Sequence, residues 1–77
     1  MIKYKHYYKD VKHLDAVDVY RVLELFNVTD PCLQHAIKKL LCAGNRGAKD
    51  EERDVEEAID TLGRYLDMRV EEELKND

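Results

Sequence analysis

A single proline directly follows an aspartate near the middle of the chain, and this Asp30-Pro31 pair constrains the fold more than any other feature. Aspartate is a favoured helix N-cap, and proline suits the first helical position because the N–H there has no intrahelical partner. Gly44 stands where a glycine that ends a helix is expected. The apolar residues between these signals recur three and four positions apart: Leu33, Ala36, Ile37, Leu40 and Leu41. The spacing predicts a helix over 31–43 with one tight apolar face.

Two further segments show the same spacing, one on each side of this helix. Asp15 and Asn27 are typical of the start and end of a helix, and they bound a predicted helix over 15–27. Its apolar stripe comprises Ala16, Val19, Tyr20, Leu23 and Phe26. Asp50 is the predicted N-cap of a helix over 51–73, whose apolar stripe comprises Val55, Ala58, Ile59, Leu62, Leu66 and Val70. No segment alternates between apolar and polar residues, so we predict no main sheet.

These elements predict a single all-α domain, with three helices in a mainly antiparallel arrangement over 15–77. Residues 1–14 are basic and rich in tyrosine without a clear period, which indicates an irregular N-terminal arm. A chain of 77 residues buries only ~60% of its unfolded surface. Because the sequence also shows no disulfide framework and no zinc-type spacing, we predict that the protein is a homo-oligomer.

The two cysteines and the hydropathy of the chain bear on its location. Cys32 and Cys42 are ten residues apart on one predicted helix, a separation of ~15 Å, whereas a disulfide requires Cα atoms within ~7 Å. Free thiols suit a reducing cytoplasm. No apolar run approaches the ~20 residues of a membrane helix, and we expect no secretion signal. We therefore predict a cytoplasmic protein without a membrane partner.

The net charge of -4 is unevenly distributed along the chain. Residues 1–14 and 30–49 each carry +3, whereas residues 50–77 carry -8. The overall acidity argues against nucleic acid as a partner, since duplex binders usually present a basic face and a high pI. The acids of the 51–73 helix are expected to form a solvated face. Asp50, which precedes the helix and lies four residues from Asp54, is expected to belong to the same face.

The segment Gly44–Lys49 is the first candidate for binding chemistry. Its two glycines let backbone N–H groups approach an anion closely, while Arg46 offers bidentate contacts and Lys49 a point charge. The helix N-terminus that follows also favours anions. The simpler interpretation is a helix stop followed by a turn, and both interpretations stay open. The three histidines match no recognised ligand spacing, so we predict no metal site at His6, His13 or His35.

A set of short motifs spans residues 6–70. They are His6-Tyr7, Asp18-Val19, Ala36-Ile37-Lys38, Ala43-Gly44, Arg46-Gly47, and Asp54, Ala58, Leu62 and Arg64. In this pattern the sequence resembles a small helical domain of tailed phages that is generally called a nucleotide kinase. That domain also forms part of the nucleoside-monophosphate kinase of some podoviruses. The chain departs from the family's asparagine, tyrosine, arginine and tyrosine at His35, Lys39, Cys42 and Thr61.

The resemblance implies a phage origin and a nucleotide or related phosphate ligand. Because three short helices cannot enclose a nucleotide alone, we expect the ligand at a subunit interface. Under this interpretation Lys38, Arg46 and Lys49 neutralise phosphate, Tyr7 stacks on a base and His6 hydrogen-bonds. Whether the ligand is turned over or only sequestered stays open, because phosphoryl transfer needs a phosphate clamp, a metal and a positioned acceptor. The cofactor therefore stays open as well. The alternative function is a phage inhibitor or adaptor that binds a host protein through the acidic third helix.

Overall fold

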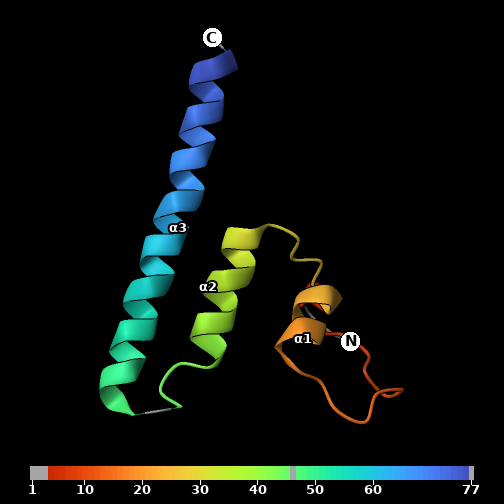
Figure 1. Cartoon of the computed structure of the whole chain (residues 1–77). Helices are drawn as coiled ribbons and strands as arrows, with labels where there is room; N and C mark the ends of the chain where they lie inside the picture. Colours follow the sequence, from red (N-terminus) through yellow and green to blue (C-terminus); the bar gives the residue numbers. More distant parts are fainter. Residues whose placement is uncertain (1–3, 46, 77) are drawn as a thin grey trace.

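The computed structural model describes residues 4–45 and 47–76, and within these ranges the chain is all-helical, without a strand. A short 3-10 turn, Lys5–Tyr7, precedes three α-helices: α1 (Val19–Leu25), α2 (Pro31–Leu41) and α3 (Ala48–Asn76). The predicted all-α class with three helices is confirmed. Figure 1 shows α2 in the middle, running toward the turn at 42–47, with α3 returning along one side and α1 on the other.

Aspartate caps begin the first two helices. Asp30 Oδ1 accepts hydrogen bonds from the backbone N–H groups of Cys32 and Leu33, at 2.8 and 3.0 Å, which confirms the predicted start of α2. α1 begins later than predicted, because its N-cap is Asp18 and not Asp15. Asp18 Oδ1 accepts a 2.9 Å hydrogen bond from the Arg21 N–H. The predicted helix over 15–27 is therefore reduced to two turns.

Asn27 ends α1 as the sequence predicts. Its φ of 56° lies in the left-handed region that asparagine tolerates. The Asn27 N–H donates to the Glu24 carbonyl at 3.1 Å, and the Val28 N–H donates to the Leu23 carbonyl at 2.9 Å. These two bonds form a Schellman motif, which satisfies carbonyls that the last turn would otherwise leave unpaired.

α3 is longer at both ends than the sequence predicts. It begins at Ala48, so Asp50 lies inside its first turn and is not the N-cap. Gly44 and Gly47 take positive φ values of 82° and 134° in the turn that precedes it. Most residues avoid this backbone region, so the two glycines permit the reversal of the chain between α2 and α3.

The hydrophobic core of the single chain is small. Leu23 is 7% exposed, and Ala36 and Ala58, one on each side of the α2–α3 contact, are both 2% exposed. Leu40 and Leu41 were expected in the core but are 50% and 57% exposed. The most buried residues of α2 and α3 are therefore alanines, while several larger side chains of the predicted faces stay largely exposed.

The shape of the molecule is open. Its radius of gyration is 15.9 Å, whereas a compact chain of this length has a radius of about 11–12 Å. Figure 1 shows the C-terminal half of α3 projecting beyond the start of α2. Within the described ranges, no helix combines the length and the apolar character that crossing a bilayer requires.

Candidate functional site

His35 and Lys38, one helical turn apart on α2, form a wall shared by two hollows of about 470 Å³ each. The first hollow lies between α1 and α2, where Tyr20 and Leu23 contribute to its lining. The second lies toward the end of α2, where Lys39, Cys42 and Asn45 contribute to the lining together with Asp54 of α3. His35 and Lys38 therefore border both hollows, and the second hollow also contains an ion-paired lysine and its acid.

Lys38 points toward α1 and contacts an exposed aromatic ring. Its Nζ lies 3.4 Å from the Tyr20 hydroxyl and 5.5 Å from the ring centroid. Within the described part of the chain, no carboxylate forms an ion pair with Lys38. Tyr20 is 66% exposed, so its assignment to an apolar core stripe is wrong. Its ring lies beside Lys38 and not in a buried contact with the apolar face of α2.

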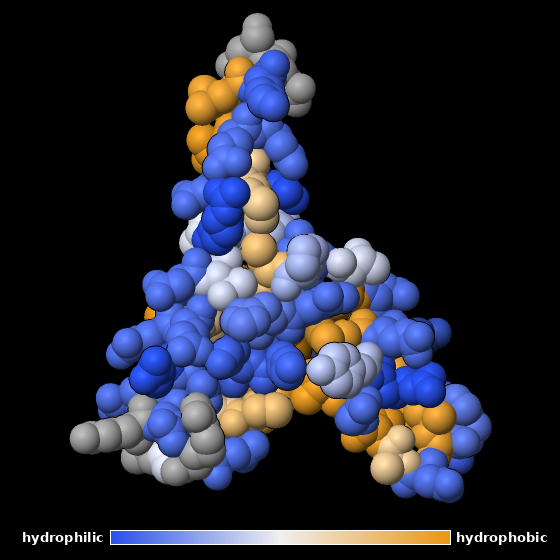
Figure 2. Space-filling model, in the orientation of Figure 1, coloured by the Kyte–Doolittle hydropathy of each residue, from blue (hydrophilic) through white to orange (hydrophobic). Residues whose placement is uncertain are grey.

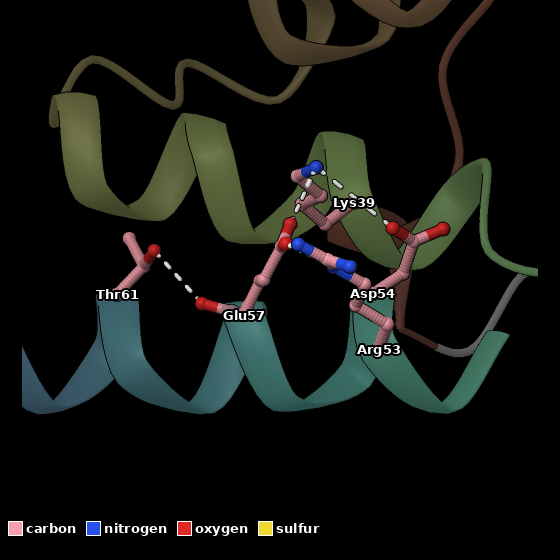
Figure 3. A network of polar contacts seen from close by, with 5 residues as sticks. All are labelled: Lys39, Arg53, Asp54, Glu57 and Thr61. Carbon is pink, nitrogen blue, oxygen red and sulfur yellow. Dashed lines mark hydrogen bonds and ion pairs between the residues drawn. The ribbon is translucent and has the colours of Figure 1, made fainter. Parts of the chain in front are cut away.

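Lys39, the next residue, points the other way and is engaged by acids of α3 (Figure 3). Its Nζ lies 2.7 Å from Glu57 Oε2 and 3.8 Å from Asp54 Oδ1. Arg53 Nε donates to Glu57 Oε1 at 3.2 Å. The hydrogen bond from Lys39, followed by that from Arg53, lowers the pKa of the Glu57 carboxyl. Glu57 is therefore held ionised between two cations.

Asp54 corrects the expectation that the acids of α3 form only a solvated face. It is 6% exposed and lies against α2 beside Ala58. A buried carboxylate requires hydrogen bonds or a counter-charge, and Lys39 provides the counter-charge. The sequence signal that identifies Asp54 is its spacing of four residues from Ala58, which puts the two on one side of the helix.

His6 and Tyr7 lie in the N-terminal arm, where they form a cluster of rings with Tyr4. The His6 and Tyr7 ring centroids are 4.3 Å apart, and those of Tyr4 and Tyr7 are 5.5 Å apart. In the described residues, none of the hydrogen bonds and ring contacts of His6 or Tyr7 reaches Lys38. The structure thus joins His6 to Tyr7, and their action together with Lys38 stays a prediction.

An acid of α3, Glu51, lies close to the first glycine of the predicted anion loop. A Cβ placed on Gly44 would lie 2.5 Å from Glu51 Oε2, so this carboxylate stands directly over the glycine. Arg46 lies outside the described residues, as does the side chain of Lys49, whose backbone belongs to the first turn of α3. Both stay predicted ligand contacts.

The two cysteines and the possible metal ligands are the remaining candidate residues. Cys32 is half-buried and Cys42 is exposed, and neither forms a disulfide. The structure brings together no group of three or more histidine, cysteine or acidic side chains that fits a metal ion, within the residues it describes.

Comparison with known proteins adds no relative to this picture. No family model, no curated protein and no solved structure matches the chain. The resemblance to the phage nucleotide kinase domain therefore stays an expectation from short motifs.

Proposed function

We propose that this is a phage-encoded protein that binds a nucleotide or a related phosphate compound beside α2. The observation that carries the proposal is the pairing of Lys38, a cation without a carboxylate partner among the described residues, with the exposed ring of Tyr20. This pair lies at the wall between two hollows. A negative group and a flat ring on one ligand match that pair.

The chemistry assigns separate roles to the neighbouring side chains. The Lys38 ammonium neutralises phosphate as a point charge, and the Tyr20 ring supplies a face on which a base stacks. His35 adds a hydrogen-bonding group one turn away on α2. Tyr20 thus takes the stacking role that the resemblance assigned to Tyr7. These groups form a binding site, and sequestration of the ligand needs nothing more than binding.

The second hollow extends this site toward the turn that ends α2. Asn45 contributes to its lining and directly precedes Arg46. We retain Arg46 and Lys49 as proposed phosphate contacts on this side, because a guanidinium offers two parallel donors to a phosphate. Independently of the ligand, we propose a cytoplasmic location, a mainly antiparallel packing of the three helices and a homo-oligomeric state.

A melting experiment tests the ligand site. Purified protein is heated at low salt with a panel of mono-, di-, tri- and cyclic nucleotides. A ligand at a hundred times its Kd adds about 2.7 kcal/mol, which raises the melting temperature by roughly 10–20 °C for a domain of this size. We expect Lys38→Met and Tyr20→Ala to abolish the shift, and Tyr20→Phe to retain most of it.

Lys12→Met is the matched control, since Lys12 is also an exposed lysine but lies in the N-terminal arm. It is expected to keep the full shift. A full shift in Lys38→Met would remove Lys38 from the site. The absence of a shift with every nucleotide would overturn the proposal itself.

One observation favours the second candidate, a protein that binds a host partner through α3. A hollow on α3 is lined mainly by acids, with Arg53 as the cation: Asp50, Glu52, Glu56, Glu57 and Asp60. Such a surface complements a basic protein surface. If this surface is the interface, a Glu52→Lys, Glu56→Lys double variant no longer retains, in a pull-down, the host protein that the wild-type chain retains. Glu57 is left unchanged in this test, because it holds Lys39.

A further inference from the structure

A row of large apolar side chains on α3 has no partner within the chain. The row, here called the α3 stripe, comprises Val55, Ile59, Leu62, Leu66 and Val70. These residues are 37% to 62% exposed, although successive helical turns align them within a sector of about 80°. Asp54 and Ala58, which meet α2, lie on another side of the helix. Figure 2 shows apolar surface along one edge of the projecting half of α3.

The exposed area of the chain is larger than a stable monomer of this mass presents. The accessible surface is 6760 Å² for a chain of 9.1 kDa. Compact monomers of that mass expose about 4,900 Å², so the excess is about 1,900 Å². A standard protein interface hides about 800 Å² on each partner, and obligate dimers hide more. The excess is therefore sufficient for a stable contact with one further chain.

Four of the five members of the α3 stripe lie symmetrically about one point of the helix. If the centre is placed between residues 62 and 63, Val55 and Val70 lie at equal distances from it, and so do Ile59 and Leu66. Leu62 lies directly beside the centre, with Gly63 as its counterpart. A two-fold symmetric contact requires such a self-complementary surface, in which residue i meets j and j meets i. Nothing lies within 4 Å of the Cβ position of Gly63, so the centre has room for the second chain.

The charges along α3 choose between the two directions of pairing. Residues 50–57 contain six acids and one arginine, whereas residues 68–75 contain three acids and two bases. A parallel pair sets the strongly acidic 50–57 segments side by side. An antiparallel pair sets each of them beside the nearly neutral 68–75 segment, which reduces the repulsion.

From these three observations we propose that the α3 stripe is the contact surface for a second copy of this chain, which lies antiparallel with its two-fold axis near Leu62. Val55 of one copy then packs on Val70 of the other, and Ile59 packs on Leu66. The stripe lies on α3, away from His35 and Lys38 on α2. The dimer and the ligand site are therefore separate proposals, each with its own test.

The mass in solution provides the first test. Sedimentation equilibrium of the full chain at micromolar concentration is expected to give twice the 9.1 kDa of one chain. Leu66→Gln brings an uncompensated amide into each of the two symmetry-related apolar contacts and weakens association by at least about 30-fold. Leu74→Gln is the matched control, because it adds the same group without a charge. Leu74 is a leucine of the same helix, 70% exposed against 62% for Leu66, but it lies outside the stripe, so the variant is expected to keep the dimer.

Cross-linking tests the direction of the pairing and does not depend on weakening the dimer. In a Cys32→Ser, Cys42→Ser background, a single cysteine is introduced as Leu62→Cys or as Val55→Cys, and each protein is oxidised. Near the axis the two Leu62 positions face one another, so Leu62→Cys forms a disulfide-linked dimer. The two Val55 positions lie ~22 Å apart along the antiparallel pair, far beyond the ~7 Å that a disulfide spans. Val55→Cys therefore stays uncrosslinked.

Two results would overturn the proposal. Efficient cross-linking through Val55→Cys would show a parallel pair. A wild-type mass of one chain, with no cross-link through Leu62→Cys, would show that something other than a second copy covers the stripe. Nucleotide binding is read separately in the melting experiment, so a failed dimer and a failed ligand site are distinguishable.

Discussion

The side of α2 that faces α3 and the side that faces α1 differ in the partners that they give to two adjacent lysines. Toward α3, Lys39 is held between Asp54 and Glu57, and an alanine of each helix is buried. Toward α1, Lys38 has an aromatic ring as its neighbour and forms no ion pair among the described residues. The flank toward α3 therefore holds two helices together, and the flank toward α1 leaves a cation without a counter-charge in the part of the chain that the structure describes. Neighbours in sequence on a helix point in different directions, which gives one helix both roles.

The largest expected effect comes from enlarging the buried contact between α2 and α3. Ala58 is 2% exposed, so Ala58→Leu forces extra methyl groups into a filled space. Such overpacking lowers the free energy of unfolding by about 1–3 kcal/mol. Each kcal/mol lowers the melting temperature of a small domain by roughly 4–8 °C. Thermal unfolding followed by circular dichroism measures the change.

Ala16→Leu serves as the control for added size, because Ala16 is exposed and precedes α1. It is expected to melt with the wild type. If Ala58→Leu also melts with the wild type, then the α2–α3 flank is not closely packed, and the contrast between the flanks disappears.

A smaller effect separates the two lysines themselves. Lys39→Met removes the cation between Asp54 and Glu57 and is expected to lower the free energy of unfolding by about 1 kcal/mol. The value is modest because the side chains of Lys39 and Glu57 are 32% and 37% exposed, and water screens the pair. Lys38→Met is expected to stay within about 0.5 kcal/mol of the wild type. Urea denaturation of both variants measures the difference, and equal midpoints would contradict it.

The smallest effect is a dependence on pH at the same flank. The pKa of Glu57 is lowered from its ordinary value of 4.5, first by the hydrogen bond from Lys39. A lowered pKa stabilises the folded chain above the unfolded value, and that contribution is lost as the pH falls through the lowered pKa. Glu57→Gln is therefore less stable than the wild type at neutral pH, and the gap closes below about pH 4.5.

Melting temperatures at a series of pH values check this expectation. Glu56→Gln is the control, since Glu56 is an exposed glutamate next in sequence. A gap between Glu57→Gln and the wild type that persists unchanged in acid would show that the ion pair is not its source.

The fold was predictable where local chemistry decides the backbone. Asp30 and Pro31 identify the first residue of α2, and Asn27 identifies the end of α1, because capping depends on one side chain and its nearest N–H groups. The start of α1 was predicted wrongly, since Asp15 and Asp18 are both competent N-caps. Only the structure shows that Asp18 accepts the hydrogen bond.

The candidate site was less predictable, because periodicity shows which residues share a helix face but not what covers that face. Tyr20 has the spacing of a core residue, yet it is exposed beside Lys38. Asp54 has the character of a surface acid, yet it lies against α2. In both residues the outcome depends on the angle at which the helices pack, and no single segment of sequence contains that information.

The short turn between α2 and α3 also has a consequence for the kinetics of folding. Residues that meet across these helices are close in sequence, so the chain closes only a small loop before they touch. Contacts of this local kind form quickly, as in other helical domains with low contact order. We therefore expect α2 and α3 to pair within one chain first. Encounter between chains then becomes the slower step, with a rate that rises with protein concentration.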